Sequence, residues 1–141
     1  MVGITLYGCS NLTTIDLTDC INLEVVSLEN CTGLTSIDLS YNDKLIGVAL
    51  SHTNIATLDL SGKTSISQVY VMQCANLTTI DLSYSSVEYI NLAECTSVTS
   101  VDVTGNTNAN QILTVHYTGT AYDEAVFTKS DGFTVEQEPF A

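Results

Sequence analysis

The chain has 141 residues, of which three are lysines, none is arginine and sixteen are acidic, and its formal net charge at pH 7 is −13. Binding to nucleic acids or to anionic membranes depends on basic side chains that neutralise phosphates, so this balance argues against both. No segment approaches the ~18 consecutive apolar residues of a membrane-spanning helix. We therefore expect no nucleic-acid partner and no membrane insertion.

A seven-residue motif recurs along the chain at intervals of 21 or 22 residues. It reads LTTIDLT at 12–18, LTSIDLS at 34–40, IATLDLS at 55–61, LTTIDLS at 77–83 and VTSVDVT at 98–104. A fixed period of this size is typical of a solenoid, in which successive coils stack and bury a continuous apolar interior.

Each copy begins a unit of 10 or 11 residues, and related units of the same length lie between these units. Their fourth and sixth residues are apolar and alternate with other residues, which is the period of a β-strand. Aspartate occupies the fifth position in one series only, so one coil holds two units and contributes one strand to each of two parallel sheets. We expect an all-β solenoid of about five coils over residues 1–120. The intervening units begin at Met1, Leu23, Leu45, Ile66, Val87 and Ile112.

The intervening units also match a known repeat pattern, L-x-x-L-x-L-x-x-N/C. The segments 23–31 (LEVVSLENC) and 87–95 (VEYINLAEC) fit it at every fixed position. This pattern resembles the leucine-rich repeat, and the short coil with a second strand in place of a helix is similar to bacterial surface repeats of the internalin and BspA-like kind. The resemblance implies a right-handed coil, a role in adhesion or recognition, and an extracellular, cell-surface or virion location.

The end of the chain departs from the repeat. We expect residues 121–141 to form a C-terminal cap over the last coil. The sequence predicts a short helix after Thr120, which would be its N-cap, and acidic residues fill its first turn. A turn at 130–132 and a final strand at 133–135 would complete this cap.

The start of the chain has no such cap. Met1 already stands at the first position of a repeat, and the first residues lack the basic and apolar regions of a signal peptide. We expect the open first coil to lie against a partner or an upstream domain. This gives an alternative function, a structural building block of an assembly or virion that makes end-to-end contacts.

Five cysteines occupy the ninth position of their units. The pattern predicts buried free thiols stacked at the turns, acting as small apolar fillers. Disulfides between Cys9 and Cys31 or between Cys74 and Cys95 are a geometric alternative at one coil spacing. Zinc is disfavoured because there is no Cys-x-x-Cys pair. The fifth cysteine, Cys20, belongs to the other series.

The aspartates of the repeated motif form a regular column flanked by serine and threonine. Carboxylates about 5 Å apart repel one another, so their charge must be offset. Hydrogen bonds to hydroxyls and water are the simplest means. Calcium bridging and binding to an ice or mineral surface are alternatives. The column comprises Asp16, Asp38, Asp59, Asp81 and Asp102.

The opposite sheet is irregular, and irregularity on a regular scaffold suggests a binding site. Tyr70 and Tyr89 would be neighbours on successive coils and would offer aromatic surface with polar tips. We expect a protein or glycan ligand there. The candidate ligand-binding residues are Tyr70, Met72, Tyr89 and His116, followed by Tyr7 and Glu29.

Catalysis has little support in the sequence. The two histidines, His52 and His116, lie on separate coils, and no motif indicates a nucleophile. The segment 62–64 (GKT) resembles the end of a phosphate-binding loop, but Thr57 stands where the earlier glycine is required. We therefore expect a noncatalytic protein without cofactors, in which Lys63 is a solvated turn residue.

Overall fold

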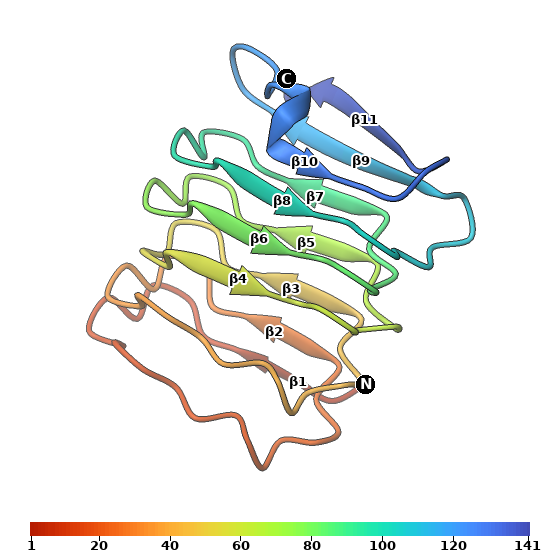
Figure 1. Ribbon diagram of the computed structural model, residues 1–141. Coiled ribbons are helices and arrows are strands. Elements are labelled where there is room, and N and C mark those ends of the chain that lie inside the picture. The colour runs from red at the N-terminus through yellow and green to blue at the C-terminus, as the bar shows by residue number, and fades with distance from the viewer.

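The protein is a parallel β-solenoid with two sheets, seen in a computed structural model that describes residues 1–141. All strand pairs are parallel, and the two sheets face each other across the interior (Figure 1). Sheet A contains β1 (Gly3–Thr5), β2 (Val25–Ser27), β3 (Gly47–Ala49), β5 (Gln68–Tyr70), β7 (Tyr89–Asn91), β9 (Ile112–Tyr117) and β11 (Thr134–Pro139). Sheet B contains β4 (Thr57–Asp59), β6 (Thr79–Asp81), β8 (Ser100–Asp102) and β10 (Phe127–Thr128).

The solenoid has about six coils of ~22 residues, rather than the five that we expected from the repeats. The difference arises in the C-terminal segment. There β10 pairs with β8 in sheet B and β11 pairs with β9 in sheet A, so both sheets are extended. The predicted turn at 130–132 is present, and the final strand runs from Thr134 to Pro139.

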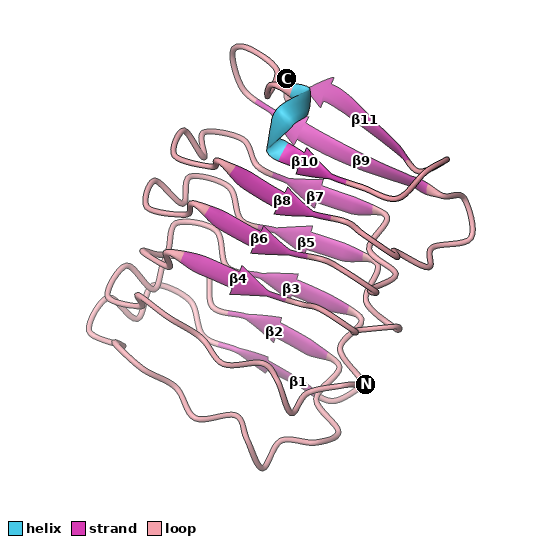
Figure 2. Cartoon of the chain, in the orientation of Figure 1, coloured by secondary structure: helices cyan, strands magenta, loops and turns pink.

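The expected C-terminal helix is absent, and that prediction was wrong. A single 3-10 turn, Glu124–Val126, is the one helical element, and it is the only helix in Figure 2. Its N-cap is Asp123, which accepts a hydrogen bond from Ala125 N, and not Thr120. The turn ends after three residues because Phe127 is only 6% exposed and pairs with Val101 as part of a strand. No helix is long enough to span a membrane.

The interior follows the predicted apolar positions. In sheet A, Val26 pairs with Val48, and the following coils place Val69, Ile90 and Val115 in the same row. These side chains belong to one continuous buried cluster of 32 residues. Each fully buried aliphatic side chain contributes about 1.5–3 kcal/mol before conformational entropy is subtracted.

Most coils turn their corner through a left-handed residue at the eighth position of the unit. Asn30, Gln73 and Glu94 have φ values of 60°, 55° and 61° after the sheet A strands, and Gly62 has a φ of 69° after β4. The residue that follows then places a side chain under the turn. The sheets therefore end at the same point in each coil, because this corner interrupts the strand geometry.

We expect Leu60→Ala to lower the free energy of unfolding by about 2–5 kcal/mol, because Leu60 is fully buried and the change leaves a cavity. Ile21→Ala is the control, since that side chain is 61% exposed, and its effect should stay within about 0.5 kcal/mol. Urea unfolding followed by circular dichroism measures both. Equal losses would contradict the assignment of the core.

Candidate functional site: an aromatic row on sheet A

Four rings form a continuous row on the outer side of sheet A near its C-terminal end. The centroids of Tyr70 and Tyr89 lie 5.4 Å apart, those of Tyr89 and His116 lie 4.9 Å apart, and those of His116 and Phe140 lie 6.0 Å apart. The rings are tilted or edge-to-face, which is the favourable arrangement for aromatic pairs. We call Tyr70, Tyr89, His116 and Phe140 the aromatic row.

Hydrogen bonds fix the row in place. Tyr89 Oη and His116 Nδ1 lie 3.2 Å apart, and His116 Nε2 lies 3.1 Å from a Glu138 carboxylate oxygen. Tyr70 Oη donates to the Gln68 side chain on the same strand. Desolvation by partial burial raises the pKa of Tyr89 above its ordinary value. The row therefore offers ring edges and hydroxyl groups held in one geometry.

The strand pairing explains why these residues meet. Tyr70 pairs with Asn91, and Asn91 pairs with His116. Tyr89 stands two residues before Asn91, and its ring contacts those of both Tyr70 and His116. Asn91 is 1% exposed and accepts a hydrogen bond from Ala93 N through its Oδ1. A short side chain at that position leaves room for the Tyr89 ring to bridge Tyr70 and His116.

The other candidates do not all join this site. Met72 is partly buried and follows Tyr70 by two residues on the same coil. Tyr7 is 72% exposed, and it lies at the far end of the solenoid together with Glu29, whose carbonyl accepts a hydrogen bond from Gly8 N. The six predicted residues thus fall into two groups, with Tyr70, Met72, Tyr89 and His116 on the coils of the row and Tyr7 and Glu29 on the first two coils.

Phe140 is the member that the sequence analysis missed. It is 41% exposed and follows β11, outside every repeat, so no periodic signal marks it. Its N–H donates to Tyr117 O at 2.7 Å, which holds the tail beside β9 and brings the ring to His116.

A shallow acidic hollow of about 470 Å³ adjoins the row. Glu88 and Glu136 provide its carboxylates and Tyr89 its aromatic side, and it is completed by Asn110, Ile112 and Thr114. No lysine contributes to this hollow. The three lysines are engaged elsewhere: Lys44 with Asn22, Lys63 with Asp43 and Lys129 with Glu124.

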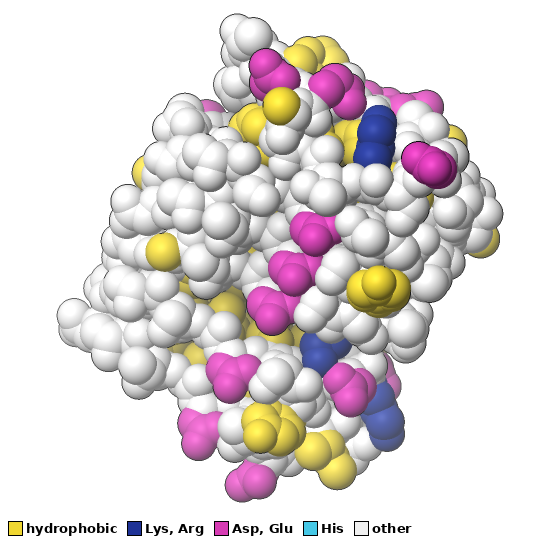
Figure 3. Space-filling model, viewed as in Figure 1, with side chains coloured by type: hydrophobic (Ala, Val, Ile, Leu, Met, Phe, Trp, Pro, Cys, Tyr) yellow, Lys and Arg dark blue, Asp and Glu magenta, His cyan; other side chains and the backbone are white.

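The aspartate column runs along sheet B. Asp59, Asp81 and Asp102 are in register, and Figure 3 shows acidic side chains aligned over these strands. Each of the five carboxylates accepts the backbone N–H of the residue two positions later, at 2.8–3.0 Å. Hydrogen bonds from the side chains of Thr18 and Ser40, and then these backbone bonds, hold the pKa of Asp16 and Asp38 below the ordinary value.

The same bonds give the column a structural role at the turns. No group of three or more histidine, cysteine, aspartate or glutamate side chains is arranged to hold a metal ion. The calcium alternative at Asp16, Asp38, Asp59, Asp81 and Asp102 therefore gains no support from the geometry.

All five cysteines are free thiols, but they are not equally buried. Cys31, Cys74 and Cys95 are buried, and Cys95 Sγ donates to Val71 O at 2.8 Å. The hydrogen bond with Cys74, together with burial, raises the pKa of Cys95. Cys9 and Cys20 are exposed, contrary to the expectation of burial, because they belong to the first coil, where no preceding coil covers them.

The expectation that Lys63 is a solvated turn residue is wrong. Lys63 is 4% exposed, and its ammonium donates to Ser40 O at 3.0 Å and to Asp43 at 2.7 Å. It occupies the ninth position of its unit, where Asn42 and Asn106 also bond backbone carbonyls of the preceding coil. The apolar stem of a lysine allows this burial once its charge is paired.

Comparisons with protein-family models, with curated proteins and with solved structures give no match. The leucine-rich-repeat resemblance of the sequence therefore stays an interpretation of the pattern. The solenoid itself is established by strand pairing and register.

We expect a water-soluble alkylating reagent to modify Cys9 and Cys20 rapidly in the folded protein and to spare the three buried thiols. Mass spectrometry of the intact protein after a short treatment measures this, and treatment in denaturant should label all five. Rapid labelling of Cys74 in the native protein, or a denatured protein with fewer than five reactive thiols, would contradict the arrangement.

Proposed function

We propose that the protein is a noncatalytic recognition or adhesion module that binds a protein or glycan through the outer side of sheet A. The observation that carries this proposal is the aromatic row, because four rings from three coils and the C-terminal tail are held in one geometry by mutual contact and hydrogen bonds. An extracellular, cell-surface or virion setting belongs to the same proposal and follows from the sequence pattern.

The physical properties of the row suit recognition. Tyrosine presents a large apolar surface and a hydroxyl, and it loses little conformational entropy on binding because it has few rotatable bonds. Here much of that entropy is already lost, since Tyr89 is fixed between Tyr70 and His116. A preorganised surface retains more of its contact energy as affinity.

We expect the double variant Tyr70→Ala/Tyr89→Ala to lose at least about tenfold in affinity for ligands that wild-type protein selects from a phage-displayed peptide library or a printed glycan array. Biolayer interferometry with the selected ligands measures the loss. Tyr41→Ala is the matched control, because Tyr41 is 61% exposed and lies in the turn after residues 34–40, away from sheet A.

Calorimetry should show a folded double variant. If the selected ligands lose affinity equally for the double variant and for Tyr41→Ala, or for neither, the aromatic row is not the surface that binds them.

A second candidate function is supported by the opposite end of the solenoid. Ile4, Leu6, Leu12 and Ile15 belong to the interior of the first coil, yet they are only partly buried. Strand β1 pairs with β2 on one side and has no strand on the other. Apolar side chains beside an unpaired strand edge suit end-to-end stacking on another subunit, as a structural building block requires.

If the chain assembles in this way, Leu6→Glu should dissociate oligomers at micromolar concentration, because a charge would be placed in the contact. Size-exclusion chromatography with light scattering measures the mass. Thr5→Glu is the control, since Thr5 points outward on the same strand. A wild-type protein that is monomeric throughout this range would argue against self-assembly.

A further inference from the structure

Sheet A carries an apolar hollow beside the aromatic row. Gly47 and Ala49 are the outward residues of strand β3, and their neighbours in register on β5 are Gln68 and Tyr70. Because β3 contributes almost no side chain to this face, a depression of about 390 Å³ lies over it, a volume in the range of ligand sites. The lining is completed by Val25, Ile46, Val48 and Ser67.

The hollow is open space above a closed interior. Val48, between the two small residues, is only 2% exposed, so the strand is packed firmly from beneath. A Cβ atom added at Gly47 would meet only Gln68 O within 4 Å beyond its chain neighbours, at 4.0 Å. An apolar group that enters from outside would remove Val25 and Ile46, of which Ile46 is 37% exposed, from water.

Tyr70 joins the hollow to the aromatic row. It lines the hollow, its hydroxyl donates to Gln68 Oε1 at 3.1 Å, and its ring centroid lies 5.4 Å from that of Tyr89. Tyr89 in turn lines the acidic hollow together with Glu88 and Glu136. The apolar hollow, the row and the acidic hollow therefore follow one another across sheet A, from β3 to β11.

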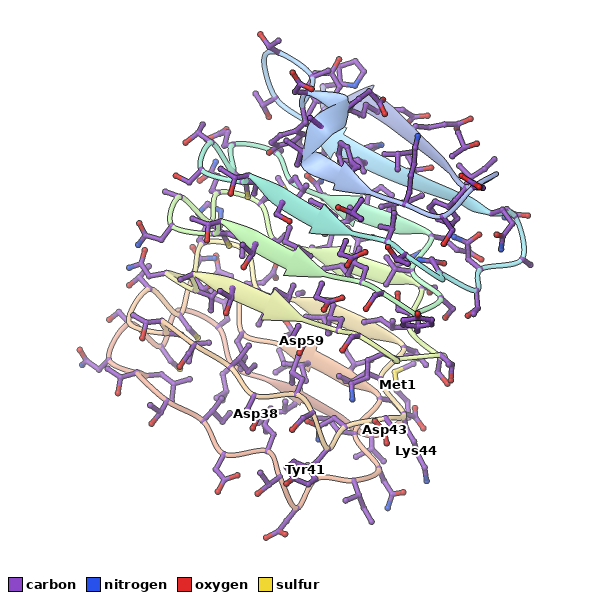
Figure 4. The ribbon with its side chains drawn as sticks, in the orientation of Figure 1. Met1, Asp38, Tyr41, Asp43, Lys44 and Asp59 are labelled. Carbon is purple, nitrogen blue, oxygen red and sulfur yellow. The ribbon has the colours of Figure 1, made fainter.

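The charges on this side of the solenoid favour a cationic partner. The carboxylates of Glu88 and Glu136 take part in no ion pair within the protein. Lys44 lies beside Asp43 at a corner of the coil (Figure 4), and its ammonium donates to Asn22. The two other lysines and the amino terminus also pair with groups outside the acidic hollow. A cation from a partner would therefore find unpaired carboxylates there.

A peptide matches this surface better than a neutral glycan does. The hollow over β3 is complementary to an aliphatic side chain, and the acidic hollow is complementary to a basic one. A third carboxylate, that of Glu138, lies beside His116 at the same end of the row. A neutral glycan offers neither an aliphatic side chain nor a cation, whereas one peptide carries both.

The strand spacing sets the distance between the two side chains. The acidic hollow lies over β9, and the sheet order β3-β5-β7-β9 places it three strands from β3. At about 4.8 Å per strand this separation is ~14 Å. In an extended peptide, side chains four residues apart are about 13 Å apart and point to the same side. Two residues would span only about half of that distance.

We propose that sheet A binds an extended peptide segment that crosses its strands and carries an aliphatic and a basic side chain four residues apart. The aliphatic side chain occupies the hollow over Gly47 and Ala49. The basic side chain reaches Glu88 along the ring of Tyr89, whose face also attracts a cation. This inference rests on the proposed function, because it names the ligand class of the same surface.

The linear peptides that wild-type protein selects from a phage-displayed library test the proposal. Among peptides whose binding requires the aromatic row, we expect enrichment of a leucine, isoleucine or valine four positions from a lysine or arginine, relative to the unselected library. Replacing either member of this pair by serine should lower the affinity at least about tenfold in biolayer interferometry.

Two matched glycine variants locate the aliphatic side chain. Gly47→Val fills the hollow, and we expect at least about a tenfold loss of affinity for the selected peptides. The melting temperature should not fall, because Gly47 does not have a positive φ and valine suits a strand. Gly3→Val makes the same change in the same row on β1, outside the hollow, and should bind as wild type does.

A second pair of variants locates the basic side chain. Glu88→Gln removes one carboxylate of the acidic hollow, and we expect about a tenfold loss of affinity. Asp19→Asn removes a charge from an exposed residue of the first coil and should leave the affinity unchanged.

The proposal is overturned, and the proposed function kept, if row-dependent peptides lack the spaced pair or if Gly47→Val and Gly3→Val bind them alike. Equal affinities of Glu88→Gln and Asp19→Asn would also overturn it. Row-dependent ligands found only on the glycan array would have the same meaning. If neither the library nor the array yields a ligand that requires the row, both the inference and the proposed function fail.

Discussion

The structure depends on the parallel register of each coil on the next. Val48 lies over Val26 and beneath Val69, and the same one-to-one pairing relates Leu58, Ile80 and Val101 on the other sheet. A slip by one residue would turn every buried side chain outward, so the apolar interior fixes the register strongly. Each outward position is thereby stacked as well, and the surface becomes a set of columns.

The two sheets use these columns differently. On sheet B the outward positions repeat nearly unchanged. One carboxylate oxygen of each aspartate there accepts a backbone hydrogen bond at the turn. On sheet A the fifth position changes from Ala49 to Tyr70, Asn91 and His116, so the pairing places unlike side chains side by side. Residues in this column can vary without changing the apolar interior, because their side chains are not part of the buried row.

The two ends of the solenoid are also unlike. At the C-terminal end, Phe127 and Phe133 cover the last coil, and Tyr122 Oη donates to Leu92 O and Cys95 O. The edge strand β11 carries Glu136, Glu138 and Pro139, which discourage pairing with another strand. At the N-terminal end the first coil lacks such protection.

The sequence by itself determined the coil, the two sheets and the columns, because burial of apolar residues at a fixed period leaves one arrangement that satisfies every repeat. It predicted that Tyr70 and Tyr89 would be neighbours, since both depend on the period. It failed where the period ends or is broken: at the C-terminal segment, where burial of Phe127 in a strand outweighed the local helix signals, and at Phe140, which lies outside every repeat.

Only the tertiary structure decided which side chains are buried at the turns and where the ladder of sheet B begins, at β4. Lys63 reads as a polar turn residue, and its burial depends on Ser40 O and Asp43, which the preceding coil supplies. This result comes from contacts between coils about twenty residues apart, and a repeat pattern records the spacing of such contacts but not their conformation.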